Sequence, residues 1–190
     1  MDNNLFISRY ANHFAQQGEV ISLAKLLDEI RSGKHATLVA QIRNTTDDKA
    51  RSVLKSKLPA VTLSGVFDGA HQAKNIKSHS GLMQIDIDKV ANVAELFAKL
   101  QKDWLVYALF LSPSGNGLKI IVRVAATIDT HKPIFFSLEN YFKNKYGIAI
   151  DSSYKDICRL MYLSSDPNIF INERAKVFEL RKPKDRKSVV

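Results

Sequence analysis

The stretch that decides the fold is LMQIDIDKVANVAELFAKLQKDWLVYALFLSPSGNGLKIIVRV (residues 82–124). Residues 83–88, MQIDID, alternate between apolar and polar side chains, which is typical of a strand with one covered face. Asn92 is a suitable N-cap for a following helix, whose apolar residues recur at helical spacing over residues 93–100. Residues 105–111, LVYALFL, are apolar throughout and therefore predict a strand that is covered on both faces.

A hairpin and a second helix complete the pattern. The turn SPSGNG (residues 112–117) contains glycines that permit a tight reversal, and LKIIVRV (residues 118–124) is expected to return as the partner strand. Thr130 is a candidate N-cap for the next helix, and Pro133 is acceptable in its first turn. We expect RLMYLSS (residues 159–165) to be the fourth strand.

The predicted order is therefore βαββαβ, and the fold class is α+β with an RRM-like or ferredoxin-like antiparallel sheet. In the usual strand order of that sheet, 4-1-3-2, the first strand is central and helices cover one face, so the opposite face can be open. RRM domains stack RNA bases on aromatic side chains of the two central strands. A simple base-stacking platform is not expected here, because the corresponding positions hold Asp86, Asp88, Lys119, Ile121 and Arg123.

The rest of the chain indicates how it is divided. Residues 1–67 predict an N-terminal α-rich αβ unit that packs on the sheet, with helices near residues 22–33 and 47–57. We expect residues 68–180 to form the RRM-like catalytic unit. The basic segment 181–190 is expected to be a disordered tail, and the whole chain to form one compact domain.

The composition favours a polyanionic partner. The chain of 190 residues is 45% apolar and carries a formal net charge of +9, with a pI near 9.6. Lysine and arginine release counterions from nucleic acid when they bind it, so this charge favours nucleic acid, although a basic tail that only aids solubility is the alternative. The longest apolar run is too short to span a bilayer, and the N-terminus has no signal pattern. A cytoplasmic protein without a membrane partner is therefore expected.

Cysteine and histidine add no metal site of their own. The chain has a single cysteine, Cys158, which excludes an internal disulfide and argues against a cysteine-based zinc site. Its five histidines show no metal-ligand spacing and are expected to be exposed or structural. The five are His13, His35, His71, His79 and His131.

Three polar clusters are expected to meet at one end of the predicted sheet. Asp86 and Asp88 lie at the C-terminal end of the first strand, on its non-apolar face. Lys119 lies at the start of the third strand, which runs antiparallel beside the first, and so lies next to the same end. Residues 151–159 immediately precede the fourth strand and also arrive there. The sequence therefore predicts one site built from distant segments.

The residue types in this site suit phosphate chemistry. Two aspartates two positions apart on a strand point the same way, with Cα atoms about 7 Å apart. They can hold a hard divalent cation, Mg²⁺ or Mn²⁺, and leave positions for phosphate oxygens and water. The alternative is a pair of solvated acids, or salt bridges to Lys89 and Lys119.

The neighbouring turn supplies candidate phosphate ligands. Glycines such as Gly115 and Gly117 let backbone N–H groups approach an anion, and Lys119 supplies a point charge. We therefore expect these three residues and Ser114 to contact phosphate. A plain hairpin turn with an exposed lysine is the alternative.

Taken in order, these motifs resemble the archaeo-eukaryotic primase, or primase-polymerase, superfamily, and in particular its VirE amino-terminal-like branch from bacterial mobile-element and phage proteins. That superfamily has an hDhD strand, an s-x-H strand, and a later hD that precedes an R-x-x-x-L-S-type strand. Each motif is short, so the resemblance depends on their order and spacing. The supporting segments cover most of residues 58–172 and are LPAVTLSGVF (58–67), SGLMQIDID (80–88), SPSGNGLKIIV (112–122) and IDSSYKDICRLMYLSSDPNIFIN (150–172).

The resemblance implies a set of catalytic residues. Asp86 and Asp88 match the hDhD motif and are implied to be metal ligands. Asp151, in IAID, matches the third acidic ligand, and Asp156 competes with it for that assignment.

The resemblance also implies phosphate-binding residues. Arg159 is similar to the arginine near the third motif, which is implied to bind phosphate. The second motif ends in a histidine that contacts the phosphates of the incoming nucleotide, and Lys119 stands in its place here. The VirE-like branch favours lysine at this position, whereas catalytic members of the superfamily rely on the histidine.

The implied function is two-metal nucleotidyl transfer with Mg²⁺ or Mn²⁺. Its partners would be single-stranded or primed DNA and nucleoside triphosphates, in the replication of a mobile element or phage. A helicase is a further expected partner, since relatives are commonly fused to one. Two alternatives stay open: a catalytically inactive nucleic-acid-binding replication accessory domain on the same fold, and a metal-dependent phosphodiesterase or nuclease.

Overall fold

The computed structural model describes residues 5–180, and the expected tail at residues 181–190 lies outside this range. Within the described part the protein is α+β, with five α-helices and three mostly antiparallel sheets. In chain order the elements are β1 Phe6–Tyr10, β2 Gly18–Ser22, α1 Leu23–Arg31, α2 Ala36–Asn44, α3 Asp48–Ser56, β3 Ala60–Thr62, β4 Gly65–Phe67, η1 Ala73–Asn75, β5 Ile76–His79, β6 Leu82–Ile87, α4 Val93–Leu100, β7 Val106–Leu111, β8 Leu118–Arg123, α5 His131–Tyr146, η2 Ser152–Lys155, β9 Met161–Tyr162 and β10 Phe170–Ile171.

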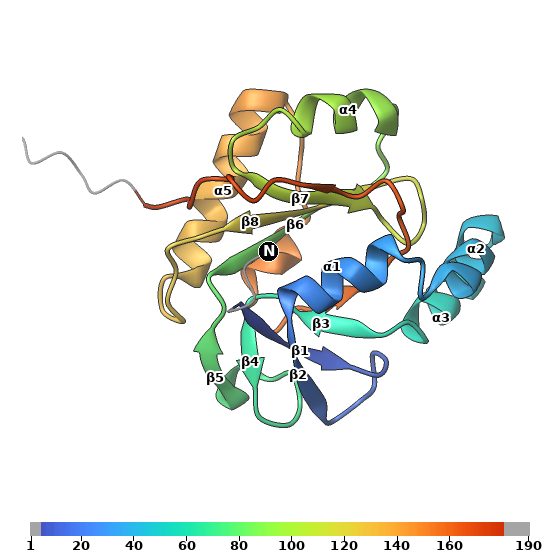
Figure 1. Cartoon of the computed structure of the whole chain (residues 1–190), viewed down its shortest axis with the longest axis horizontal. Coiled ribbons are helices and arrows are strands. Elements are labelled where there is room, and N and C mark those ends of the chain that lie inside the picture. Colours follow the sequence, from blue (N-terminus) through green and yellow to red (C-terminus); the bar gives the residue numbers. More distant parts are fainter. Residues whose placement is uncertain (1–4, 181–190) are drawn as a thin grey trace, which may run out of the picture.

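The sheet that carries the candidate site has the strand order β10-β7-β8-β6. Within it β6, β8 and β7 place the first, third and second predicted strands side by side, and both pairings are antiparallel as expected. Apolar side chains of this sheet pack against α4 and α5, which cover one face (Figure 1). The alternating pattern of β6 and the apolar run of β7 therefore predicted these strands and their helical cover correctly.

The predicted fourth strand is wrong. Residues 159–165 contribute only the short strand β9, which pairs with β3 in a different sheet of order β2-β1-β3-β9. The reason is burial, since Met161 and Leu163 belong to the core between the two sheets. As a result β6 is an edge strand of its sheet rather than the central one. At that edge the backbone N–H of Asp151 donates to the carbonyl oxygen of Asp86 at 2.9 Å.

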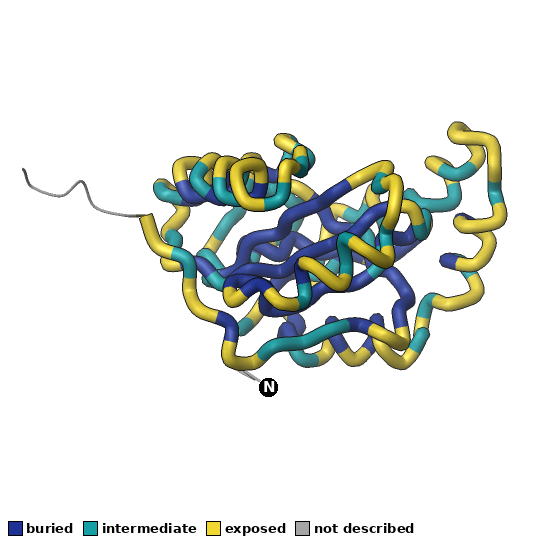
Figure 2. The backbone as a smooth tube through the Cα atoms, turned by 90° about the horizontal axis from the view of Figure 1, so that it is seen from above, coloured by how far each residue is buried: buried dark blue, intermediate teal, exposed yellow. Residues whose placement is uncertain are grey.

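The second face of the β10-β7-β8-β6 sheet is covered, which corrects the expectation of an open face. Helix α1 lies between this sheet and the β2-β1-β3-β9 sheet (Figure 1). Leu26, Leu27 and Ile30 of α1 join Tyr107 and Ile121 of the site-bearing sheet in one buried core. Figure 2 shows the buried residues along the strands inside the molecule, with exposed residues along the outer helices. Both faces of this sheet are therefore covered.

The N-terminal part contains more strand than the sequence indicated. Strands β1 and β2 and helix α2 were not predicted, whereas α1 and α3 lie where they were expected. Ser22 caps α1 by accepting from the N–H of Lys25, and Asn92 caps α4 by accepting from the N–H of Glu95. Thr130 makes no such bond to α5 and instead accepts from the N–H of Thr127. The division at residue 67 stays a prediction. Strand β3, which precedes it, pairs with β9, which follows it.

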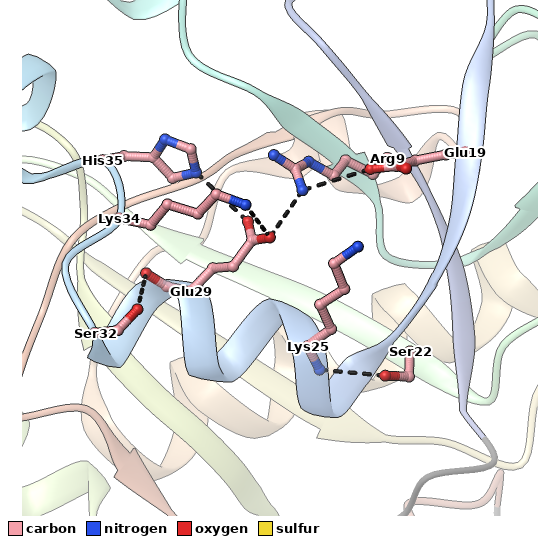
Figure 3. Close-up of polar contacts among 8 residues, drawn as sticks. All are labelled: Arg9, Glu19, Ser22, Lys25, Glu29, Ser32, Lys34 and His35. Atoms are coloured by element: carbon pink, nitrogen blue, oxygen red, sulfur yellow. Dashed lines mark hydrogen bonds and ion pairs between the residues drawn. The ribbon is translucent and has the colours of Figure 1, made fainter.

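A buried carboxylate ties α1 to the strands beside it. Glu29 accepts from Arg9 at 2.8 Å and from Lys34 at 2.6 Å, and His35 lies 3.5 Å away (Figure 3). Burial raises the pKa of Glu29, but Lys34 and Arg9 outweigh it and lower the pKa below its usual value. This cluster holds the helix in place, because a buried carboxylate without cationic partners is strongly disfavoured.

No helix among residues 5–180 combines the length and the apolar character that crossing a membrane requires.

Candidate functional site

The site is built around an ion pair between neighbouring strands. Asp86 of β6 lies directly opposite Lys119 of β8 in the strand register. The Lys119 ammonium donates to Oδ2 of Asp86 at 2.6 Å, and the two residues are only 4% and 7% exposed. Tyr154, from η2, donates its hydroxyl to the same oxygen at 2.9 Å. Three segments far apart in the sequence therefore converge on one carboxylate oxygen.

The charges in this group stabilise one another. Burial alone would lower the pKa of Lys119, but the adjacent Asp86 carboxylate raises it above its ordinary value, so Lys119 is protonated. Burial raises the pKa of Tyr154 to about 12, so its phenol stays a hydrogen-bond donor. Lys119 is thus a buried partner of Asp86 in this structure, and its expected contact with phosphate stays a prediction.

The second oxygen of Asp86 has no partner within the described residues. Oδ1 is buried and accepts no hydrogen bond. Asp88 lies two residues further along, just past the end of β6, and is exposed. The surrounding protein and the nearby charge of Asp86 raise the pKa of Asp88. An unsatisfied carboxylate oxygen beside a second carboxylate is a fitting environment for a divalent cation, because buried acceptors are otherwise almost always bonded.

The third predicted ligand lies nearby but is occupied. The carboxylate of Asp151 accepts from the N–H of Ser153 at 2.9 Å and from its hydroxyl at 2.8 Å, which caps η2. Its competitor Asp156 accepts from the N–H of Cys158 at 3.0 Å. Within residues 5–180 no three histidine, cysteine, aspartate or glutamate side chains are arranged as a ready-made metal cluster. Asp86 and Asp88 are therefore the residues on which a cation site depends.

A cavity of about 270 Å³ opens beside Asp88 and is lined by both basic and acidic side chains. Its lining includes Arg51 and Lys55 from α3, together with Ser114 from the turn. The pKa of the half-buried Lys55 is lowered, because burial and the charge of Lys119 outweigh the opposite effect of Asp88 and Asp86. Arg51 is held rigidly, since it donates to the carbonyl oxygen of Thr45 at 2.7 Å and 2.9 Å. With Lys89 the lining has three cationic side chains and, with Asp48, two acidic ones, and Arg51 is ion paired with Asp48 at 2.9 Å.

The glycines of the turn allow its tight packing against β6, and their expected contact with phosphate stays a prediction. Gly115 has a φ of +77°, and its N–H donates to the carbonyl oxygen of Ser112 at 2.9 Å. Gly117 lies so close to β6 that an added Cβ would be 2.5 Å from the carbonyl oxygen of Ile87. A side chain at residue 117 would therefore push the turn away from the end of β6. Of the predicted turn residues, Ser114 lines the cavity.

Arg159 lies apart from the cavity beside Asp88. Its guanidinium carbon is 5.7 Å from the ring centroid of Tyr154, and it lines a different cavity. Tyr154 connects the two places, because its hydroxyl contacts Asp86 while its ring faces Arg159.

Three residues of the site, Tyr154, Arg51 and Lys55, were not predicted as site residues from the motifs. Tyr154 lies inside the IDSSYKD segment, but a tyrosine in an irregular connection gave no periodic signal. Lys55 is one of several lysines on the polar side of a short helix, and only tertiary packing brings it to Asp88.

Comparison with known families gives one match. The model described as "BT4734-like, N-terminal domain" matches residues 53–170 of the chain. That segment contains Asp86, Asp88, Lys119, Asp151 and Tyr154. Searches of curated proteins and of solved structures found no match to the chain.

Proposed function

The chain belongs to the BT4734-like N-terminal domain family, and we propose that it is a primase-polymerase-like nucleotidyltransferase that acts on single-stranded or primed DNA. The observation that carries this proposal is the buried, unpartnered Oδ1 of Asp86, two residues before Asp88, which itself lines a cavity with cationic side chains. A cation held by the two carboxylates would then lie close to side chains able to bind phosphate, as nucleotidyl transfer requires. The sequence resemblance to primase-polymerases, including the mobile-element and phage context, supports the same reading.

The residues divide the work between cation and phosphates. Asp86 and Asp88 would hold Mg²⁺ or Mn²⁺, with Asp151 close by, and the bound cation would supply activation of a 3′-hydroxyl and neutralisation of phosphate charge. Lys55 and Arg51 line the cavity, so they can bind the phosphates of a nucleotide through charge-assisted hydrogen bonds. Lys119 acts through Asp86, since its ammonium donates to that carboxylate and fixes its orientation.

A second candidate function is favoured by one specific contact. The Lys119 ammonium already neutralises Asp86 at 2.6 Å inside the protein, so Asp86 has an internal cation. A nucleic-acid-binding replication accessory domain without catalysis would need no more than this and the basic surface. This candidate predicts DNA binding that is independent of divalent cations.

Primer extension separates the two candidates. We expect labelled product from primed or unprimed single-stranded template with nucleoside triphosphates and Mg²⁺ or Mn²⁺, and none after EDTA removes the cation, because Asp86 and Asp88 then repel the phosphates. The measurement is gel electrophoresis of the extended strand. Absence of product with either cation, alongside retained DNA binding, contradicts the catalytic proposal and favours the accessory domain. Loss of labelled DNA without added nucleotides indicates a nuclease instead.

A further inference from the structure

A second cavity, of about 290 Å³, lies next to the site and is lined largely by rings. Its rings are those of His13, His71, Tyr154 and Tyr162, and Arg159 supplies a guanidinium. These residues come from the β1–β2 connection, the segment after β4, η2, β9 and the segment between η2 and β9. None of them has been given a role in the proposed function, and Tyr154 alone touches the candidate site, through its hydroxyl bond to Asp86.

Three of these rings, those of Tyr162, His13 and His71, form a connected cluster. The hydroxyl of Tyr162 lies 2.9 Å from Nδ1 of His13, and the two ring centroids are 5.9 Å apart. His13 and His71 have ring centroids 6.3 Å apart. His71 also packs edge-on against Tyr10, at 5.2 Å, and Tyr10 is fully buried. The cluster is therefore anchored in the core at one end and open to solvent at the other.

The cavity also holds a cation that the protein does not use. Within residues 5–180 the Arg159 side chain makes no hydrogen bond and no ion pair, and its contact is with the face of the Tyr154 ring. The lining carboxylate, Asp156, already accepts from the N–H of Cys158. A guanidinium that stacks on a tyrosine and keeps its N–H groups available suits a phosphate oxygen.

We infer that this cavity binds an unpaired nucleotide of a single-stranded nucleic acid, with the base among the rings and the adjoining phosphate on Arg159. Aromatic and histidine rings stack on bases of any sequence, and arginine adds its charge to such platforms. The volume, about 290 Å³, lies just below the range of about 300–1,000 Å³ for small-molecule sites, which suits one nucleotide rather than a larger ligand.

A strand fits better than a free nucleotide because the aromatic surface continues outside the cavity. Phe14 is 69% exposed and stands edge-on to His13, with ring centroids 5.3 Å apart. An exposed phenylalanine at the rim offers a second stacking position for the next base. A free nucleotide would leave this ring in water.

The location also connects the strand to the candidate site. Tyr154 lines the cavity with its ring and donates its hydroxyl to Asp86, so a nucleotide held here lies one side chain from the acidic pair. The inference rests on the proposed function for its choice of nucleic acid as partner. Binding in this cavity does not require a divalent cation, so it can be tested separately from synthesis.

Fluorescence anisotropy with a short labelled single-stranded DNA in EDTA tests the inference on the full chain. Phe14→Ala and His13→Ala are each expected to weaken binding about 5- to 150-fold, which corresponds to the loss of one stacked base. Arg159→Ala should weaken binding and lower the salt dependence by about one phosphate contact. Phe136→Ala, which removes an exposed aromatic from α5, is the matched control and should bind like the wild type.

Two further ligands identify what the cavity holds. Duplex DNA and an oligonucleotide with abasic positions should bind more weakly than the intact single strand, because neither presents free bases. Unchanged affinity of the Phe14→Ala and His13→Ala variants, or equal affinity for duplex and single strand, overturns the inference. The inference is also overturned if an equal concentration of free deoxynucleotide displaces the oligonucleotide and Phe14→Ala does not change the affinity. A free nucleotide is then the occupant. If the protein does not extend primers but these variants still bind DNA more weakly than the wild type, the proposed function fails and the inference holds.

Discussion

The Asp88→Asn variant is expected to lose nucleotidyl transfer by at least about 100-fold while it stays folded. Asparagine keeps the size of the side chain but removes the negative charge that a divalent cation requires. Asp88 is exposed and lies past the end of β6, so the free energy of unfolding should change by no more than about 0.5 kcal/mol. Primer extension and chemical denaturation of the same preparation measure the two effects.

The matched control is Asp129→Asn, which removes an exposed aspartate from the connection between β8 and α5. It lowers the acidic charge of the protein by the same amount but lies outside the site, so its synthesis should equal that of the wild type. Full synthesis by Asp88→Asn contradicts the role proposed for Asp88. A loss that both variants share would point to an effect of overall charge.

The second large effect is expected on stability. Asp86→Ala should lower the free energy of unfolding by about 3–5 kcal/mol, because it leaves the buried Lys119 ammonium without its carboxylate. Tyr154 would lose its hydrogen-bond acceptor as well. This expectation explains why Asp88, and not Asp86, is the residue with which to test catalysis.

A double-mutant cycle measured by urea unfolding isolates the pair. Lys119→Met alone should also destabilise the protein, because Asp86 then keeps only the Tyr154 hydroxyl. The double variant Asp86→Ala, Lys119→Met should be more stable than the sum of the two single changes predicts, since no buried charge is left unpaired. Single changes that cost less than about 1 kcal/mol, or strictly additive effects, contradict the buried ion pair.

The part of the fold that was predictable from sequence has strong local patterns. Apolar and polar side chains alternate in β6, β7 is apolar throughout, and α4 has an N-cap residue and an apolar stripe. Each of these elements is therefore predicted from its own residues. The short strands β1, β2 and β9 have no such pattern. The pairing of β9 with β3 depends on Met161 entering a core that is made mostly by distant residues, and periodicity carries no information about that choice.

The position of the candidate site was also predictable only in part. Antiparallel order was enough to place Lys119 beside Asp86, and the register confirms that placement. The expectation of an open sheet face was wrong because α1 covers that face. The burial of Lys119 was not predictable, because its neighbour Tyr154 comes from a distant irregular segment. Arg159 was expected near the phosphates of the site, whereas its side chain lies along the ring of Tyr154 and lines a separate cavity.

The most direct test of the cation site is an NMR titration with Mn²⁺, whose unpaired electrons broaden signals from nearby nuclei. The account predicts that substoichiometric Mn²⁺ removes the amide signals of Asp86, Asp88 and the adjoining residues 151–153, and that Asp88→Asn restores them. Signals that broaden only elsewhere, or equally in wild type and Asp88→Asn, would contradict a cation held by this acidic pair.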